Sequence, residues 1–163
     1  MAESHHQILL ITFAKAQAAR AAYEDAVGLP GLRQAAVLER SAEGLLDVPE
    51  SHVSGAGVPT AGAGLAGGLL GLVGGPIGVF LGAAAGVALG GAAEDLRMQE
   101  GGAGMIMLSS RVEDGAALLI VDLRESEPEP ADELARRHGG TLERLRAKEF
   151  AAQVRAAEQA AGG

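Results

Sequence analysis

Apolar residues form short runs of strand length in both halves of the chain. Residues 5–14 and 116–125 are rich in Ile, Leu and Val, and residues 32–40 form a third run of similar length. Turn residues bound each run, a pattern that predicts β-strands. Weaker versions at residues 45–50 and 141–149 predict two further strands, so that each half of the chain contains at least two.

Apolar positions at helical spacing separate these runs. In residues 15–28, Ala19, Ala22, Tyr23 and Ala26 share one stripe, and Gly28 is a natural stop. Residues 105–115 predict a short amphipathic helix, and the Ala-rich residues 150–161 a terminal one. Residues 126–140 predict a helix that Ser126 caps. This helix has Pro128 and Pro130 in its first turn, and Arg136, Arg137 and His138 near its end.

The order of these elements predicts a fold class. Strand–helix–strand occurs once before residue 54 and once after residue 94, with an extra short strand in the first half. Two such units in one chain are typical of a ferredoxin-like α+β sandwich, an antiparallel sheet with helices on one face. The chain then divides into a first half (1–54), an inserted segment (55–93) and a second half with the C-terminal helix (94–163).

The inserted segment has a composition unlike the rest of the chain. From Ser51 to Ala93 no residue is formally charged unless His52 is protonated. Gly75 and Pro76 predict a tight turn between two helices, at about 60–74 and 76–93. Gly74, Gly78, Gly82, Gly86 and Gly90 follow a strict four-residue step. Together with Gly67 and Gly71 they would line one face of each helix and let a partner backbone approach closely.

Such a glycine ladder is costly in water, where each Gly destabilises a helix by about 1 kcal/mol relative to Ala. A bilayer or a large protein interface offsets that cost, because the backbone there must bond internally. The second helix spans about 27 Å at 1.5 Å per residue, slightly less than a hydrocarbon core of about 30 Å. The residues that flank the uncharged segment, Glu50, Glu94 and Asp95, are acidic, and no Trp or Tyr borders the segment. The length of the whole uncharged run favours a membrane hairpin, whereas its acidic flanks and the missing aromatic residues favour a soluble assembly.

Charge and composition exclude other classes. The 163 residues carry a net charge of −8, which argues against a nucleic-acid partner. With no Cys in the chain, disulfides and thiolate chemistry are excluded. The first residues lack the features of a secretory signal, so we expect the cytoplasm or the cytoplasmic face of the inner membrane.

In the order of its elements the chain resembles a bacterial family, domain of unknown function 1269, whose members are described as predicted membrane proteins. The resemblance rests on HQILLITFA, on QAAVLERSAEGLLDVPE and above all on SGAGVPTAGAGLAGGLLGLVGGPIGVFLGAAAGVALGG, followed by AALLIVDL and a helix that ends in HGG. It covers most of the chain. It implies a ferredoxin-like domain with a glycine-rich helical hairpin and no known activity.

Motifs that bear chemistry have simpler explanations. GAGLAG (62–67) matches a dinucleotide fingerprint, but no strand precedes it and no acid follows at the required distance. The adjacent His5 and His6 would point to opposite faces of a strand, away from a metal shared with His52 and His138. Ser109 and Ser110 have no neighbouring base. The acids Glu127, Glu129, Asp132 and Glu133 suit a helix start.

The sequence therefore predicts no catalytic, cofactor-binding or metal-binding residue, and we expect a protein that is not an enzyme. The leading hypothesis is a membrane-associated protein that self-associates through its glycine-zipper hairpin, with the lipid bilayer and other copies of itself as partners. The alternative is a soluble assembly in the cytoplasm, such as a ring, shell or filament, with the hairpins packed in its interior.

Overall fold

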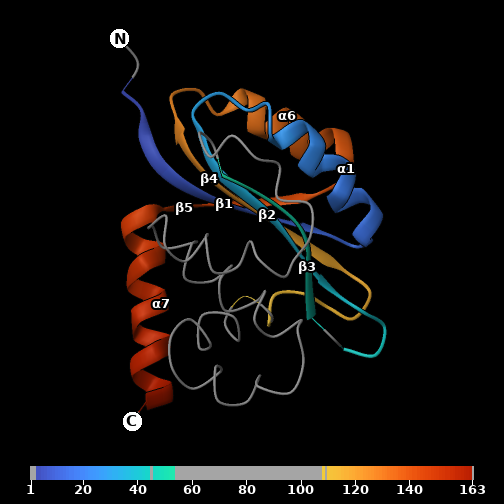
Figure 1. Ribbon diagram of the computed structural model, residues 1–163. Helices are drawn as coiled ribbons and strands as arrows, with labels where there is room; N and C mark the ends of the chain where they lie inside the picture. Colours follow the sequence, from blue (N-terminus) through green and yellow to red (C-terminus); the bar gives the residue numbers. More distant parts are fainter. Residues whose placement is uncertain (1–2, 45, 54–107, 109, 163) are drawn as a thin grey trace.

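The computed structural model describes residues 3–44, 46–53, 108 and 110–162. Within them the chain forms a five-stranded antiparallel sheet and three helices, an α+β fold (Figure 1). In chain order the elements are β1 (His5–Phe13), α1 (Ala16–Ala26), β2 (Leu32–Arg40), β3 (Leu46–Val53), β4 (Ala117–Glu125), α6 (Glu129–His138), β5 (Thr141–Arg146) and α7 (Ala147–Gly162).

The strands lie in the order β3-β2-β4-β1-β5. β4 is antiparallel to both β1 and β2, so β1 and β2 run in the same direction with β4 between them. β1 in turn lies between β4 and β5, which share the other direction. Each strand–helix–strand unit is therefore split by a strand from the other half of the chain, and β3 extends the sheet beside β2.

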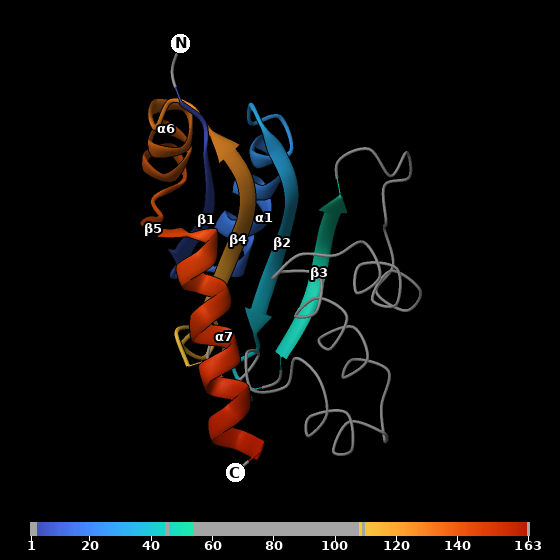
Figure 2. The same ribbon diagram turned by 90° about the vertical axis from the view of Figure 1, so that its left-hand side faces the viewer.

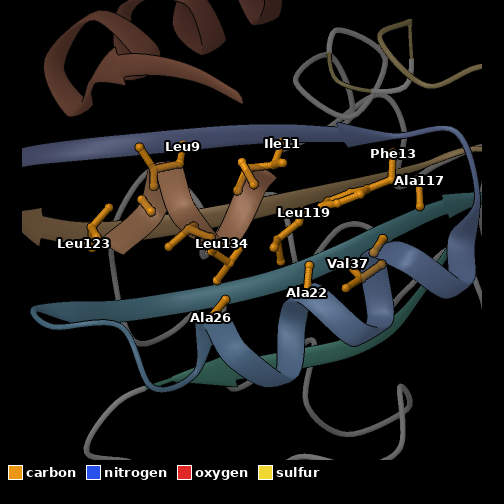
Figure 3. Close-up of a cluster of buried hydrophobic side chains, with 14 residues drawn as sticks. Leu9, Ile11, Phe13, Ala22, Ala26, Val37, Ala117, Leu119, Leu123 and Leu134 are labelled. Atoms are coloured by element: carbon orange, nitrogen blue, oxygen red, sulfur yellow. The ribbon is translucent and has the colours of Figure 1, made fainter. Parts of the chain in front are cut away.

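One face of the sheet packs against α1 and α6 (Figure 3). Alanines on α1 present little more than a methyl group, which lets the helix lie close to the strands, and α6 contributes Leu134. The fully or nearly fully buried residues of this cluster are Leu9, Ile11, Phe13, Ala19, Ala22, Ala26, Val37, Ala117, Leu119, Val121, Leu123, Ala131, Leu134 and Ala135.

The opposite face is covered too, which corrects the expectation that helices lie on one face only. Figure 2 shows α7 in front of the sheet and α1 behind it. Ala147 and Phe150 of α7 pack against Ile8 and Leu10 of β1 on this second face. Burial on both faces explains why β1 and β4 are continuous apolar runs, whereas a strand with one solvated face would alternate.

Several local expectations are also wrong. Of residues 105–115, where a helix is expected, Leu108 is helical, residues 110–115 form turns with Gly115 at φ +81°, and residues 105–107 and 109 lie outside the described part of the chain. The residue that caps α6 is Pro128, whose carbonyl accepts the first helical hydrogen bond from Asp132; no side chain caps the helix, so Ser126 has no such role. The last strand stops at Arg146, because Ala147, Lys148 and Glu149 are good helix formers and already belong to α7.

The inserted segment at 55–93 lies outside the described residues, and so do its glycines and its expected turn at Gly75 and Pro76. The division into 1–54, 55–93 and 94–163 therefore stays a prediction. Among the helices that the structure does describe, none combines the length and the apolar character that crossing a bilayer requires.

Candidate functional site

A buried carboxylate lies in the middle of the sheet. Asp122 is on β4, its side chain is 0% exposed, and its neighbours across the strands are Ile8 and Gln34. It occupies the second face, the one that α7 partly covers, because Leu118 and Ile120 precede it on that face. A buried carboxylate costs several kcal/mol unless it is paired, so its contacts decide what it does there.

His6 of β1 pairs with this carboxylate. Its Nε2 lies 2.6 Å from Oδ1 of Asp122, and Nη1 of Arg33 lies 3.3 Å from the same nitrogen. One ring nitrogen either donates or accepts a hydrogen bond, but cannot do both. From the short distance we assign a proton on Nε2 that is donated to Asp122. The Arg33 contact is then a close approach of two donor groups.

Two buried acceptors in this cluster have no donor in the described part of the chain. They are Oδ2 of Asp122 and Oε1 of Gln34, and Gln34 is only 3% exposed. The two residues face each other across β2 and β4, where side chains on one face start about 5 Å apart. Buried polar atoms without partners are rare in native structures and point to a functional role or to a bound group.

We refer to His6, Arg33, Gln34 and Asp122 together as the polar cluster. The imidazole is held in one orientation by Asp122, and 28% of its side chain is exposed. Such a pair can hold a cationic side chain beside it, as the approach of Arg33 shows. The described residues around it include no hydroxyl or thiol hydrogen-bonded to the imidazole, so the geometry shows no activated nucleophile.

A second buried carboxylate lies on the face that α1 and α6 cover. Glu125, at the end of β4, accepts hydrogen bonds from Nε and Nη2 of Arg144 at 2.9 Å each. Arg144 also donates to Asp132 at 2.7 Å and to the carbonyl of Pro128 at 3.0 Å. Its hydrogen bond to Glu125 raises the pKa of Arg144 further above its ordinary value. This network joins β4, β5 and the start of α6, and every charge in it has a partner.

A concave site of about 370 Å³ opens beside this network, between the end of β4 and the start of α6. Leu29, Pro30, Leu123 and Pro130 form much of its wall, and Glu127 contributes a carboxylate. The site lies on the opposite face of the sheet from the polar cluster. Its charged lining residues are Arg124, Glu125 and Glu127, of which Glu125 is paired with Arg144. None of the residues that line this site has a buried side-chain nitrogen or oxygen without a hydrogen-bond partner.

A surface pair joins α1 to α6, and Tyr23 of α1 is partly buried nearby on the same helix. Oδ2 of Asp25 on α1 lies 2.7 Å from Nε2 of His138 on α6, and this hydrogen bond lowers the pKa of Asp25. Burial, and secondarily the charge of Glu50, raise the pKa of Tyr23 to about 12. Tyr23 therefore stays a neutral phenol beside β3.

The structure separates most of the residues that the sequence singled out. His6 is in the polar cluster, whereas His138 pairs with Asp25 on the other side of the sheet. Within the described ranges no three His, Asp or Glu side chains gather closely enough to hold a metal ion. Glu129 and Asp132 are in the first turn of α6, where acids were expected, and Glu133 pairs with Arg136. GAGLAG and Ser109 fall outside the described residues.

Sequence reasoning missed the polar cluster except for His6, which it treated as one of four scattered histidines. One signal was available, because Asp122 is the single charged residue within AALLIVDL. Comparison with models of protein families, with curated proteins and with solved structures found no match. The function is therefore argued from the residues themselves.

Proposed function

We propose that this chain is a non-enzymatic protein that attaches to a membrane and self-associates through the uncharged segment at 55–93. In this proposal the described residues form a ferredoxin-like domain, and the segment is a helical hairpin inserted into it. The split strand–helix–strand units and the order β2-β4-β1-β5 support the ferredoxin-like assignment, with β3 as an added edge strand.

The observation that carries the proposal is that the five described strands pair with one another into one sheet. Every one of the five strands finds its hydrogen-bonding partners among the described residues. The chain leaves the sheet after Val53, at the end of β3, and Leu108 is fully buried in the cluster beneath α7. We infer that a long stretch without charge, lying between two halves of a sheet whose described strands already pair with one another, has a role beyond that sheet.

The resemblance to the family of domain of unknown function 1269 supports the same proposal, because that family's members are described as membrane proteins. The protein would then lie at the cytoplasmic face of the inner membrane, with the hairpin in the bilayer. Close packing through Gly82 and Gly86 would join copies of the chain, since small residues at four-residue steps let helix backbones approach.

The second candidate is a soluble assembly in which the hairpins of many copies pack together. The acidic residues Glu50, Glu94 and Asp95, and the lack of Trp and Tyr at the ends of the segment, favour it. Both candidates use the glycine ladder for self-association, and they differ in whether lipid surrounds it.

Membrane fractionation of cells that produce the full chain separates the two. We expect the protein to sediment with membranes, to resist high salt and to need detergent for its release. A protein that stays in the supernatant as a large particle would establish the soluble assembly instead.

Self-association is tested in the detergent extract by native mass measurement. Gly82→Leu and Gly86→Leu fill the groove that close packing needs, so we expect smaller oligomers. Leu81→Ala is the matched control on the same predicted helix, and it should alter the oligomer less. Unchanged oligomers in both glycine variants would overturn the zipper.

A further inference from the structure

Three basic side chains from distant parts of the sequence meet at one end of the sheet. His6 of β1 and Arg124 of β4 are direct partners across the two strands. Arg33 of β2 brings Nη1 to within 3.3 Å of the imidazole. We call these three residues the basic cluster, and it is a local exception in a chain of net charge −8.

The strand geometry places the basic cluster on the face that α7 partly covers. Partners in an antiparallel pair project to the same face, and about 5 Å separates their Cβ atoms, so Arg124 projects beside His6. Arg33 lies at an irregularity of the ladder, because the register shifts between Leu32 and Gln34. A bulge of this kind redirects a side chain, and here it accompanies the approach of Arg33 to His6.

The arginines of this cluster have no carboxylate partner in the described structure. This distinguishes them from most described arginines, which form the pairs Arg20–Glu39, Arg40–Asp114, Arg111–Glu143, Arg136–Glu133, Arg137–Asp25 and Arg144–Glu125. Arg33 is partly buried, and its contact is with a His6 nitrogen already engaged with Asp122. The N–H donors of both guanidinium groups are therefore available to an anionic ligand.

The basic cluster also lies where the uncharged segment begins. Gln34, the neighbour of Arg33, pairs with Val53, the last residue of β3. The chain continues from Val53 into the segment that we propose to enter the membrane. If the segment enters a bilayer directly after β3, a guanidinium beside Val53 lies at the level of the lipid head groups. Its planar fork matches the oxygens of a phosphate.

We propose that His6, Arg33 and Arg124 bind the phosphate of an anionic phospholipid at the base of the hairpin. This rests on the proposed membrane attachment and adds to it a lipid class. The hairpin supplies attachment by burial, whereas the basic cluster selects anionic head groups and fixes the domain against the surface. Asp122, buried beneath His6, holds the imidazole in place for this contact.

Flotation of the full chain with vesicles tests the proposal. One set of vesicles is pure phosphatidylcholine, and the other contains phosphatidylglycerol as well. We expect stronger binding to the anionic set, and about fivefold weaker partitioning to it for each of Arg33→Gln and Arg124→Gln, the factor that corresponds to about 1 kcal/mol per basic residue at an anionic surface. Arg146→Gln is the matched control, because Arg146 is exposed and projects from the other face of the sheet.

The outcomes separate this proposal from the proposed function. Equal binding of the unmodified chain to both sets of vesicles would overturn the lipid contact and leave hairpin attachment intact. Binding to neither set would overturn the membrane proposal itself. If inorganic phosphate displaces nothing from anionic vesicles but protects the chain against thermal unfolding, the site takes free phosphate and the lipid assignment is wrong.

Arg33→Gln also receives a thermal melt, because Arg33 belongs to the polar cluster and its contact with His6 can contribute to stability. A large fall in melting temperature with unchanged lipid preference in both variants would make the cluster structural and overturn the proposal. Arg124 is exposed, so Arg124→Gln should fold normally and still show the loss of preference.

Discussion

Arg144 donates hydrogen bonds from two nitrogens to the buried carboxylate of Glu125 and from a third to Asp132 in the first turn of α6. Both bonds to Glu125 are 2.9 Å long, and the side chain of Glu125 is only 7% exposed. The pair joins the edge strand β5 to the end of β4, although β1 lies between these strands.

Replacing Arg144 by Met should destabilise the domain by about 3 kcal/mol, because the variant leaves a buried charge on Glu125 without a partner. Denaturant unfolding measures the change. Arg136→Met is the control, since it breaks an exposed pair with Glu133 and should cost less than about 1 kcal/mol. Equal losses in the two variants would mean that Glu125 is not effectively buried.

Gly31 lies in a turn that permits little else. Its φ is +74°, and a Cβ there would lie 2.1 Å from the carbonyl oxygen of Arg124. Gly31→Ala should therefore cost about 3 kcal/mol or more, from the left-handed backbone and from the overlap together. Gly139 has φ +71° but open space around it, so Gly139→Ala should cost about 1–2 kcal/mol. Thermal or denaturant melts compare the two, and equal costs would contradict the close approach at Arg124.

The packing of α7 on the second face depends on Phe150, which is fully buried. Phe150→Ala should cost about 3–5 kcal/mol of unfolding free energy, the usual range for a large buried aromatic. Gln153→Ala changes an exposed residue of the same helix and should alter stability by less than about 0.5 kcal/mol. A Phe150 variant as stable as the control would mean that α7 does not form part of the core.

Acid should weaken the contact between α1 and α6. The hydrogen bond from His138, together with the charges of His138 and Arg137, holds the pKa of Asp25 below its ordinary value of 3.8. A carboxylate with a lowered pKa stabilises the fold above the unfolded value, and that contribution disappears as the pH falls through the folded value. Between about pH 5 and pH 2, stability should therefore fall more steeply in the unmodified chain than in Asp25→Asn.

Melts across that pH range measure the difference. Glu24→Gln, which removes a neighbouring exposed charge on α1, should keep the steep dependence. The prediction is wrong if Asp25→Asn and the unmodified chain lose stability in parallel.

A chain in which a short Gly/Ser linker replaces residues 55–93 should fold. The pairing of all five strands, and the burial of Leu108 beyond the replaced part, give the physical reason. Circular dichroism and a single cooperative melt would show a folded product, and Phe150→Ala in the same background should lower its melting temperature. A product without a cooperative transition would mean that the segment contributes to the core.

The strands were predictable because their apolar runs are long and bounded by turns. Residues 32–40 match β2 at both ends, and residues 5–14 exceed β1 by one residue. The cover on the second face was not predicted, although residues 118–121 are continuously apolar, the pattern of a strand buried on both sides. The order of the strands places β1 inside the sheet, and α7 packs on the second face there through Ala147 and Phe150.

The polar and basic clusters could not be read from spacing. His6, Arg33 and Asp122 lie on three strands, and only the position of β4 between β1 and β2 brings them together. A ladder irregularity beside Arg33 adds a contact that strict alternation does not predict. The cap at Pro128 was missed for a local reason, because Ser126 lies two residues too early to reach the free amides of α6.

The place of β4 in the sheet has a consequence for synthesis. Of the described strands, β1 is the first that the ribosome produces, and its described partners β4 and β5 both come after residue 116. Because a chain leaves the ribosome from its N-terminal side, residues 55–93 emerge before β4 and β5, the described partners of β1, have been synthesised. Under the proposed function, the uncharged segment would then meet a bilayer or another nascent copy before the described sheet is complete.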